Sequence, residues 1–282
     1  MLIVSYPANQ LGNGLRSVLS TKIFADAVGA DFVIDFGKRS CSETAETSIR
    51  VLLPDYVCLT PPQGIRELDE QECMRWTSLY GTNSDPVVEA VFNPLNSFPS
   101  EGFGVLHIYS TKPDFMSVEH YLVAKRREYQ NMSFPGVLRD VVKRFCHEWD
   151  LSHAVGMHIR NTDNLLDRSK ARLATPFSAF ERKLRELIAE HRLVLLCTDN
   201  QEIRDYLVST YRRSIILPKI VGEEFQALYE MMLLAETARV IGTYSSTFAY
   251  EACLFKGTDL ELFENSVWKR YPFSSLRSAP NS

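Results

Sequence analysis

The 282-residue sequence contains no run of ~18 consecutive apolar residues, the length that a membrane-spanning helix needs. The apolar stretch at its start, residues 2–4, is also far too short for a signal peptide. An excess of positive charge is missing as well, because the net charge is −4. We therefore expect a cytoplasmic protein, bacterial or made by a virus in the host cytoplasm, with no membrane anchor and no broad nucleic-acid-binding face.

Cysteine is scarce and shows no pattern. The sequence contains no Cys-x-x-Cys pair, and no cysteine stands at metal-ligand spacing from a histidine. Cys197 and Cys253 lie inside apolar runs, as small core residues do. We expect reduced thiols at all six positions, namely Cys41, Cys58, Cys73, Cys146, Cys197 and Cys253.

Three motifs that hold nucleotides or metal ions are also missing. Gly12 and Gly14 lack the third glycine of the dinucleotide-binding Gly-x-Gly-x-x-Gly motif, which disfavours a dehydrogenase or an epimerase. We also expect no Tyr-x-x-x-Lys pair, which disfavours the same class. No Gly-Lys-Ser or Gly-Lys-Thr is present, which excludes a P-loop. No Asp-x-Asp follows a predicted strand, so the sequence offers no carboxylate pair there for a divalent ion.

The second half of the sequence contains a regular alternation of apolar strands and amphipathic helices. Hydrophobic residues make up 45% and charged residues 23% of the chain, as in ordinary globular proteins. The alternation predicts a doubly wound α/β domain with a parallel sheet, followed by a polar tail without predicted elements over residues 266–282. The expected strands are residues 155–159, 193–197, 214–217, 240–242 and 260–263, and the expected helices are residues 177–192, 202–211, 225–238 and 247–255.

The first half opens with strand, turn, helix and strand, which predicts a βαβ unit. These elements are expected at residues 2–6, 7–14, 15–28 and 32–36, with Gly29 ending the helix. Further on we expect short helices at residues 46–53 and 65–76, a strand at 105–109, and helices at 117–130 and 135–149. The chain length suits two domains, residues 1–150 and residues 151–282.

Gly12, Asn13 and Gly14 stand in the predicted turn before the first helix. Glycines at such a place allow a phosphate or a sugar to approach the backbone and the helix N-terminus. Glycine also simply permits a tight turn. Both interpretations remain open from the residues alone.

Polar clusters follow three of the strands predicted in the second half, at residues 158–163, 197–200 and 242–247. In a parallel sheet these three clusters lie at one edge, where open α/β sheets bind ligands. Arg160 stays charged at any working pH and can donate two hydrogen bonds to phosphate oxygens. The hydroxyls before the last helix favour an anion site, although N-capping by Ser246 or Thr247 explains them too.

These motifs resemble those of the superfamily that contains α-1,6-fucosyltransferases, nodulation fucosyltransferases and protein O-fucosyltransferases. The family's Gly-Leu-Gly-Asn-Arg-Leu turn has a counterpart in residues 10–15, Gln-Leu-Gly-Asn-Gly-Leu. Its His-x-Arg-Arg-Thr-Asp strand end matches residues 158–163, and its Thr-Asp pair matches residues 198–199. Its Ser-Ser/Thr-Phe-Ser helix start is similar to residues 245–248.

The resemblance implies a GT-B glycosyltransferase with two Rossmann-like doubly wound domains facing a central cleft, an N-terminal acceptor side and a C-terminal donor side. It implies metal-independent, inverting transfer from a nucleotide-diphosphate sugar to a hydroxyl of an oligosaccharide or glycan. Arg160 would then stabilise the departing diphosphate. The implied donor-binding residues are Gly12, Asn13, Gly14, Arg160, Thr198, Asp199, Ser245, Ser246 and Thr247, and the implied catalytic residues are Arg160, Asp163 and His158.

Several alternatives remain within this resemblance. Asn161 replaces the second arginine of the family's pair, so the donor stays open between GDP-fucose and another nucleotide sugar such as UDP-xylose, which would make the protein a xylosyltransferase. Asp163 is a candidate base or orients Arg160, with Asp35 and Asp69 as other candidate bases. His158 lines the cleft or is a core histidine. The alternative function is a catalytically inactive nucleotide- or glycan-binding module.

Overall fold

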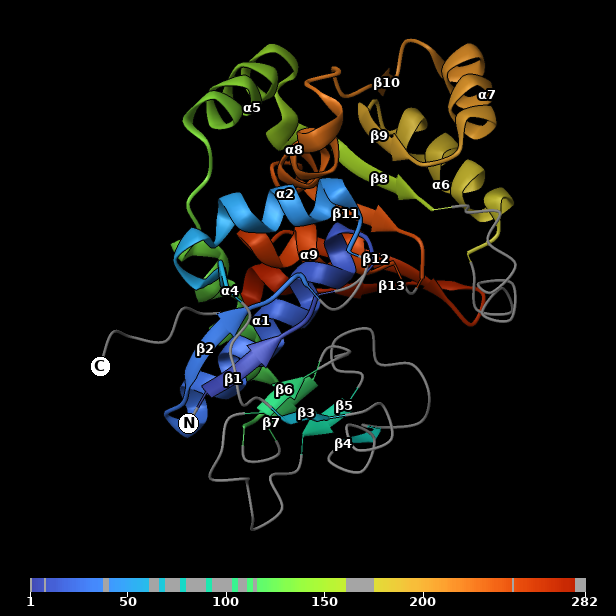
Figure 1. The fold of residues 1–282 in the computed structure, drawn as a ribbon. Coiled ribbons are helices and arrows are strands. Elements are labelled where there is room, and N and C mark those ends of the chain that lie inside the picture. Colours follow the sequence, from blue (N-terminus) through green and yellow to red (C-terminus); the bar gives the residue numbers. More distant parts are fainter. Residues whose placement is uncertain are drawn as a thin grey trace. The chain divides into compact units, whose positions relative to one another are not determined.

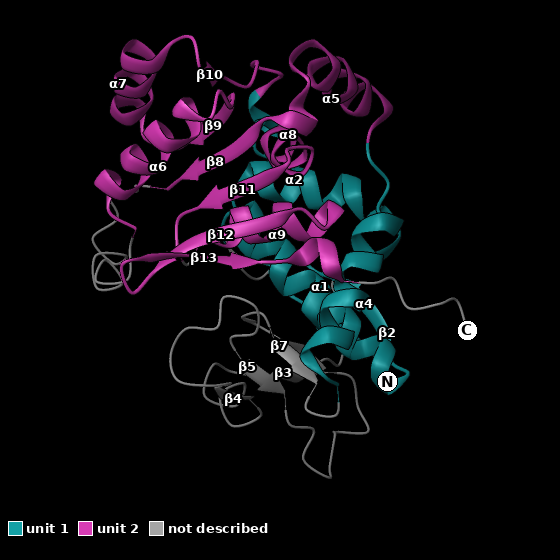
Figure 2. Ribbon diagram, turned by 180° about the vertical axis from the view of Figure 1, so that it is seen from behind, with its two compact units in different colours: residues 1–134, 223–227, 277–282 teal, residues 135–222, 228–276 magenta. Residues whose placement is uncertain are grey.

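The computed structural model describes residues 2–7, 9–37, 41–60, 116–160, 175–244 and 246–276, together with the backbone of short strands between residues 66 and 113 (Figure 1). The chain forms two compact units (Figure 2). The first unit comprises residues 1–134, 223–227 and 277–282, and the second comprises residues 135–222 and 228–276.

The first unit contains a parallel sheet of four strands in the order β2-β1-β6-β3. Helix α1 connects β1 to β2, so the predicted βαβ unit is confirmed, and Gly29 ends the helix with a left-handed φ of 67°. A second sheet has the order β4-β5-β7. The strands are β1 (Leu2–Ser5), β2 (Asp31–Ile34), β3 (Arg66–Leu68), β4 (Thr77–Leu79), β5 (Ala90–Phe92), β6 (Phe103–Val105) and β7 (Thr111–Pro113), and the helices are α1 (Leu11–Val28), α2 (Glu43–Leu52) and α4 (Val118–Asn131).

Two predictions for the first unit are wrong. Helix α1 begins at Leu11 instead of residue 15, and its first helical bond runs from Gly14 N to Gln10 O over 2.9 Å. Residues 66–68 form strand β3 and not a helix, because they pair in parallel with β6, a partner far along the chain. The strand expected at residues 105–109 meets β6 at Val105 only, and its remainder lies outside the described residues.

The second unit contains a sheet in the order β10-β9-β8-β11-β12-β13, parallel except for the edge strand β13. Counted along the chain, this is the order 3-2-1-4-5-6 of dinucleotide-binding sheets, which reverses between β8 and β11. The predicted doubly wound α/β arrangement is confirmed. Its elements are β8 (Val155–Ile159), β9 (Val194–Thr198), β10 (Ile215–Ile216), β11 (Arg239–Gly242), β12 (Asp259–Glu264), β13 (Val267–Tyr271), α5 (Gly136–Trp149), α6 (Phe177–Ala189), α7 (Gln201–Tyr211), α8 (Glu223–Ala235) and α9 (Thr247–Lys256).

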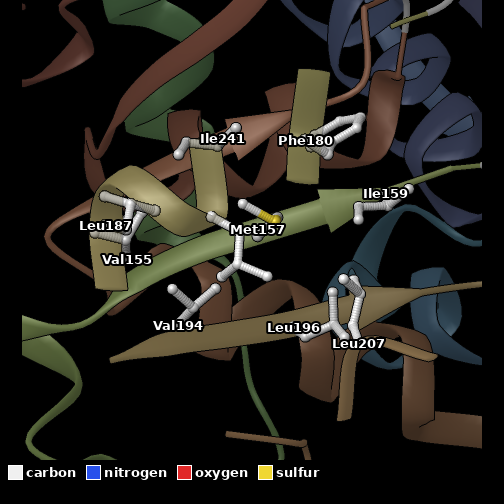
Figure 3. Packing of buried hydrophobic residues seen from close by; sticks show 10 residues of the cluster. Val155, Met157, Ile159, Phe180, Leu187, Val194, Leu196, Leu207 and Ile241 are labelled. Carbon is white, nitrogen blue, oxygen red and sulfur yellow. The ribbon is translucent and has the colours of Figure 1, made fainter. Parts of the chain in front are cut away.

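Both faces of strand β8 are covered by helices, which explains why all five of its residues are buried. Val155, Met157 and Ile159 belong to a buried cluster with side chains of α6 and α7 (Figure 3). Gly156 faces the opposite side, where an added Cβ would lie 2.8 Å from Leu234 Cδ2 of α8. His158 alternates to the same side as Gly156 and therefore faces α9.

Strand β13 falls in the tail for which no element was predicted, and it forms an antiparallel hairpin with β12. Asn265 and Ser266 make the turn, with φ angles of 50° and 69°, as two-residue hairpin turns of type I′ require. Trp268 packs against two aromatic rings. Its ring centroid lies 5.6 Å from that of Phe180 in α6 and 5.3 Å from that of Phe263 in β12. This aromatic contact between distant segments stabilises a strand that its polar sequence does not reveal.

Candidate functional site

The carboxyl ends of β8, β9 and β11 lie at one edge of the second unit's sheet, as predicted. His158 pairs in register with Cys197 on one side and with Gly242 on the other. Two residues after each of these three paired positions, the chain carries Arg160, Asp199 and Tyr244, respectively. Since the strand order reverses between β8 and β11, this edge is where a sheet of this order binds ligands.

Thr243 joins the ends of β8 and β11. Its hydroxyl accepts a hydrogen bond from Arg160 N at 2.9 Å and donates to His158 O at 3.3 Å. Its backbone N–H also donates to His158 O, at 3.1 Å. Thr243 is only 6% exposed, its hydroxyl bond to His158 O is buried, and its bond with Arg160 N is part-buried. The backbone from which the Arg160 side chain projects is thereby attached to the neighbouring strand.

Thr175 makes a second attachment at the same place. Its hydroxyl accepts a hydrogen bond from Tyr244 N at 3.0 Å. Arg160 and Thr175 stand on either side of residues 161–174, and both are bonded to the end of β11. Asp163, a candidate for the base or for a residue that orients Arg160, lies between them and outside the described residues.

His158 is a buried residue with defined partners. Its Nδ1 lies 3.2 Å from Ser246 Oγ, and its ring stacks on Phe248 with 5.0 Å between ring centroids. Burial and, to a smaller extent, the charge of Arg160 together lower the pKa of His158 from 6.5 to about 3. The imidazole is therefore neutral near pH 7, and the positive charge at the end of β8 belongs to Arg160.

The start of helix α9 has no side-chain cap, although N-capping by Ser246 or Thr247 was one interpretation of its hydroxyls. Ser246 occupies the N-cap position, yet its side chain makes no capping bond, because its hydroxyl lies against His158. The interpretation of Ser246 as a simple cap is therefore wrong. Thr247 is the first helical residue and is buried, whereas Ser245 lies outside the described residues.

Thr198 and Asp199 end strand β9, beside β8. The Thr198 hydroxyl accepts a hydrogen bond from Asn200 N at 3.2 Å, and Asn200 Oδ1 caps helix α7 by accepting from Ile203 N at 2.9 Å. These bonds shape the turn after β9. Asp199 is exposed at this turn, where its carboxylate can accept hydrogen bonds from a ligand.

In the first unit, Gly12, Asn13 and Gly14 lie in the first turns of α1, after the carboxyl end of β1. Both glycines are buried and Asn13 is partly exposed. A Cβ on Gly14 would lie 2.8 Å from Ile49 Cδ1 of α2, so the close packing of α1 on α2 accounts for this glycine. The interpretation of Gly14 as a turn residue is wrong, and a role in binding remains a proposal.

Asp35 follows strand β2 and is 5% exposed. Its Oδ1 accepts a hydrogen bond from Gly37 N at 2.7 Å, which shapes the turn after the strand. Asp69, the other alternative base, lies outside the described residues. The geometry of Asp35 is that of a turn-forming carboxylate.

The expectation that no Tyr-x-x-x-Lys pair is present is wrong, because the first unit contains residues with this spacing. Tyr121 and Lys125 stand one helical turn apart on α4, and both are 0% exposed. The Tyr121 hydroxyl lies 2.7 Å from Ser20 Oγ of α1. Because no substrate reaches side chains at this depth, the pair belongs to the packing of α1 on α4.

Within the described ranges, no group of three or more His, Cys, Asp or Glu side chains is arranged to hold a metal ion, and no helix is both long and apolar enough to span a membrane. Cys197 and Cys253 are buried, as predicted, and burial raises the pKa of both thiols. The described cysteines are free thiols, whereas Cys73 lies outside these ranges.

Comparison with solved structures identifies the fold. No protein-family model and no curated protein sequence matches the chain. The α-1,6-fucosyltransferase NodZ from Bradyrhizobium, co-crystallised with GDP, superposes with a TM-score of 0.59 at 16% identity over 96% of this chain and 98% of NodZ. A mutant of FUT1 from Arabidopsis thaliana in complex with GDP superposes with a TM-score of 0.56 at 15% identity, over 95% of this chain and 73% of FUT1. POFUT1 superposes with a TM-score of 0.52 at 10% identity, over 91% of this chain and 94% of POFUT1.

The chain therefore has the α/β fold of GT-B glycosyltransferases, as the sequence motifs predicted. Within that class the similar structures are fucosyltransferases, the superfamily that those motifs resemble.

Proposed function

We propose that the protein is a metal-independent, inverting glycosyltransferase that moves a sugar from a nucleotide-diphosphate sugar to a hydroxyl of an oligosaccharide or glycan. The similar structures of NodZ and of the FUT1 mutant contain GDP. A structure of NodZ soaked with GDP-fucose superposes on this chain with a TM-score of 0.58 at 17% sequence identity. GDP-fucose is therefore the first donor to test, with UDP-xylose as the rival. In this proposal the domain of residues 1–150 takes the acceptor and that of residues 151–282 holds the donor.

The observation that carries the proposal is the position of Arg160. This permanent cation lies at the point where the strand order reverses, next to a neutral histidine and on the same sheet edge as the start of α9. A diphosphate leaving group gains negative charge as its bond to the sugar breaks, and a guanidinium can donate two hydrogen bonds to it. The dipole of α9 favours the same charge, and in this proposal Ser245, Ser246 and Thr247 would hold the phosphates.

The transfer then needs one proton acceptor. The acceptor oxygen attacks the anomeric carbon from the face opposite the diphosphate, the bond to the diphosphate breaks, and the configuration inverts. The hydroxyl proton passes to a base, for which Asp163 is the candidate. Thr198 and Asp199 would contact the base or ribose of the donor, and Gly12, Asn13 and Gly14 are the further candidates for donor binding.

A thermal-shift panel with GDP, UDP, ADP and CMP tests the binding half of the proposal. A nucleotide that binds the native state at about 100 times its Kd should stabilise it by ~2.7 kcal/mol and raise the Tm. Incubation with the matching nucleotide sugar then tests catalysis, because a glycosyltransferase releases some free sugar by hydrolysis without an acceptor. If no nucleotide raises the Tm, the proposal is wrong. Binding without any release of sugar would identify the inactive module instead.

A further inference from the structure

We propose that Thr243 is a positioning residue that orients Arg160 toward the donor diphosphate. This inference rests on the proposed function, since it concerns the same site. Thr243 lies 83 positions from Arg160 in the sequence, and its hydroxyl accepts the Arg160 N–H at 2.9 Å.

The pattern of strand hydrogen bonds shows why a hydroxyl is needed at this position. In a parallel pair the bonds alternate evenly between the two strands. Since Thr243 N donates to His158 O, the next donor, Arg160 N, would ordinarily meet the backbone carbonyl of Thr243. That carbonyl instead accepts from Ser246 N at 3.0 Å, because the chain turns there toward α9. The hydroxyl of Thr243 takes the place of the missing carbonyl.

The surroundings leave little freedom for another arrangement. A Cβ on Gly242 would lie 2.9 Å from Ala249 Cβ and 3.3 Å from Leu260 Cδ1, so β11 is tightly packed at the residue before Thr243. The Thr243 hydroxyl also donates to His158 O, which leaves its lone pairs directed toward Arg160 N. If residue 243 has no hydroxyl, the part-buried backbone N–H of Arg160 loses its hydrogen-bond acceptor.

The consequence for binding follows from the length of the arginine side chain. A small rotation of the Arg160 backbone moves the guanidinium much farther than it moves the Cα. A displaced guanidinium no longer meets the phosphate oxygens in the fixed geometry that its two hydrogen bonds need. Loss of the Thr243 hydroxyl is therefore expected to weaken binding of the diphosphate without any change in charge.

Three variants of the full-length protein separate positioning from general destabilisation. Thr243→Val keeps the shape of the side chain and removes the hydroxyl, whereas Thr243→Ser keeps the hydroxyl. Thr237→Val is the matched control, because Thr237 is 5% exposed and its hydroxyl bonds Leu234 O at 2.7 Å and Arg239 O at 3.1 Å, at the opposite end of β11. Each variant is measured by calorimetric titration with GDP, or with UDP if the wild type prefers it, and by its Tm.

We expect Thr243→Val to weaken nucleotide binding by about tenfold or more, and Thr243→Ser and Thr237→Val to stay within about threefold of the wild type. Thr243→Val and Thr237→Val should lower the Tm by similar amounts. If Thr243→Val does not fold, Thr243→Ala replaces it with the same expected loss. Wild-type affinity in the folded hydroxyl-free variant, or an equal loss in Thr237→Val, would overturn the positioning role. A wild type that binds no nucleotide overturns the proposed function and this inference with it.

Discussion

Ser246 Oγ lies 3.2 Å from His158 Nδ1, so the residue that precedes helix α9 is bonded to strand β8 and not to its own helix. Ser246→Ala should therefore act through the histidine. We expect the free energy of unfolding to fall by about 1–3 kcal/mol, because a buried imidazole nitrogen loses its partner. Chemical denaturation measures this change.

Asn200→Ala provides the comparison, because Asn200 is a true cap that accepts from Ile203 N. Its loss should cost about 1 kcal/mol. A double-mutant cycle of Ser246→Ala with His158→Phe should give a coupling of about 0.5–3 kcal/mol, since the two side chains are in contact. Additive effects in this cycle would contradict the hydrogen bond.

The buried His158 also makes stability depend on pH. Its pKa is about 3 in the folded protein and 6.5 in the reference state, so the unfolded chain binds the proton more tightly. Above pH 6.5 the histidine contributes its full stability, and this contribution falls as the pH drops from 6.5 toward 3. The slope from this one group should reach ~1.4 kcal/mol per pH unit.

His158→Phe removes this titration while it preserves an aromatic ring on Phe248. The free energy of unfolding of the wild type minus that of His158→Phe, measured from pH 7 to pH 4, should therefore decrease as the pH falls, because only the wild type loses the contribution of the neutral histidine. Carboxylates that titrate in the same range cancel in this difference. A constant difference across the range would show that His158 is not buried in its neutral form.

Arg160→Lys should preserve the fold and abolish most of the turnover. The ammonium keeps the charge but cannot donate the two fixed hydrogen bonds of a guanidinium. We expect kcat/KM for donor hydrolysis to fall by about 10²-fold or more. Arg185→Lys is the control, because Arg185 bonds Glu181 and Tyr211 on the surface of the second unit. A near wild-type rate in Arg160→Lys would refute the role assigned to Arg160.

Gly14 allows packing and ligand binding to be separated. An alanine at this position places its Cβ 2.8 Å from Ile49 Cδ1, so Gly14→Ala should destabilise the protein by about 1–3 kcal/mol. Ile49→Val removes that Cδ1 atom, and the double variant should recover most of the lost stability. Denaturation gives the stability, and nucleotide titration gives the affinity. If stability returns without affinity, Gly14 also admits the ligand, whereas no recovery of stability would refute the packing explanation.

Much of the second unit could be predicted from local sequence. The run from Val155 to Ile159 is buried at every position and apolar except at His158, because helices cover both faces of the strand, and it ends at the charged Arg160. Alternation of such runs with amphipathic helices implies a parallel sheet, and a parallel sheet brings the polar strand ends to one edge. The candidate residues His158, Arg160 and Ser246 could therefore be chosen from the sequence alone.

The amino-acid sequence by itself determined the α/β class, most of the elements of the second unit and the edge on which its polar residues meet. Only the tertiary structure decided that α1 begins at Leu11, that residues 66–68 pair as a strand and that Trp268 anchors a final hairpin. Only the tertiary structure also showed that Thr243 holds Arg160 and that Ser246 holds His158. Except for the start of α1, each of these features depends on a contact between residues far apart in the chain, and local propensity and periodicity carry no information about such partners.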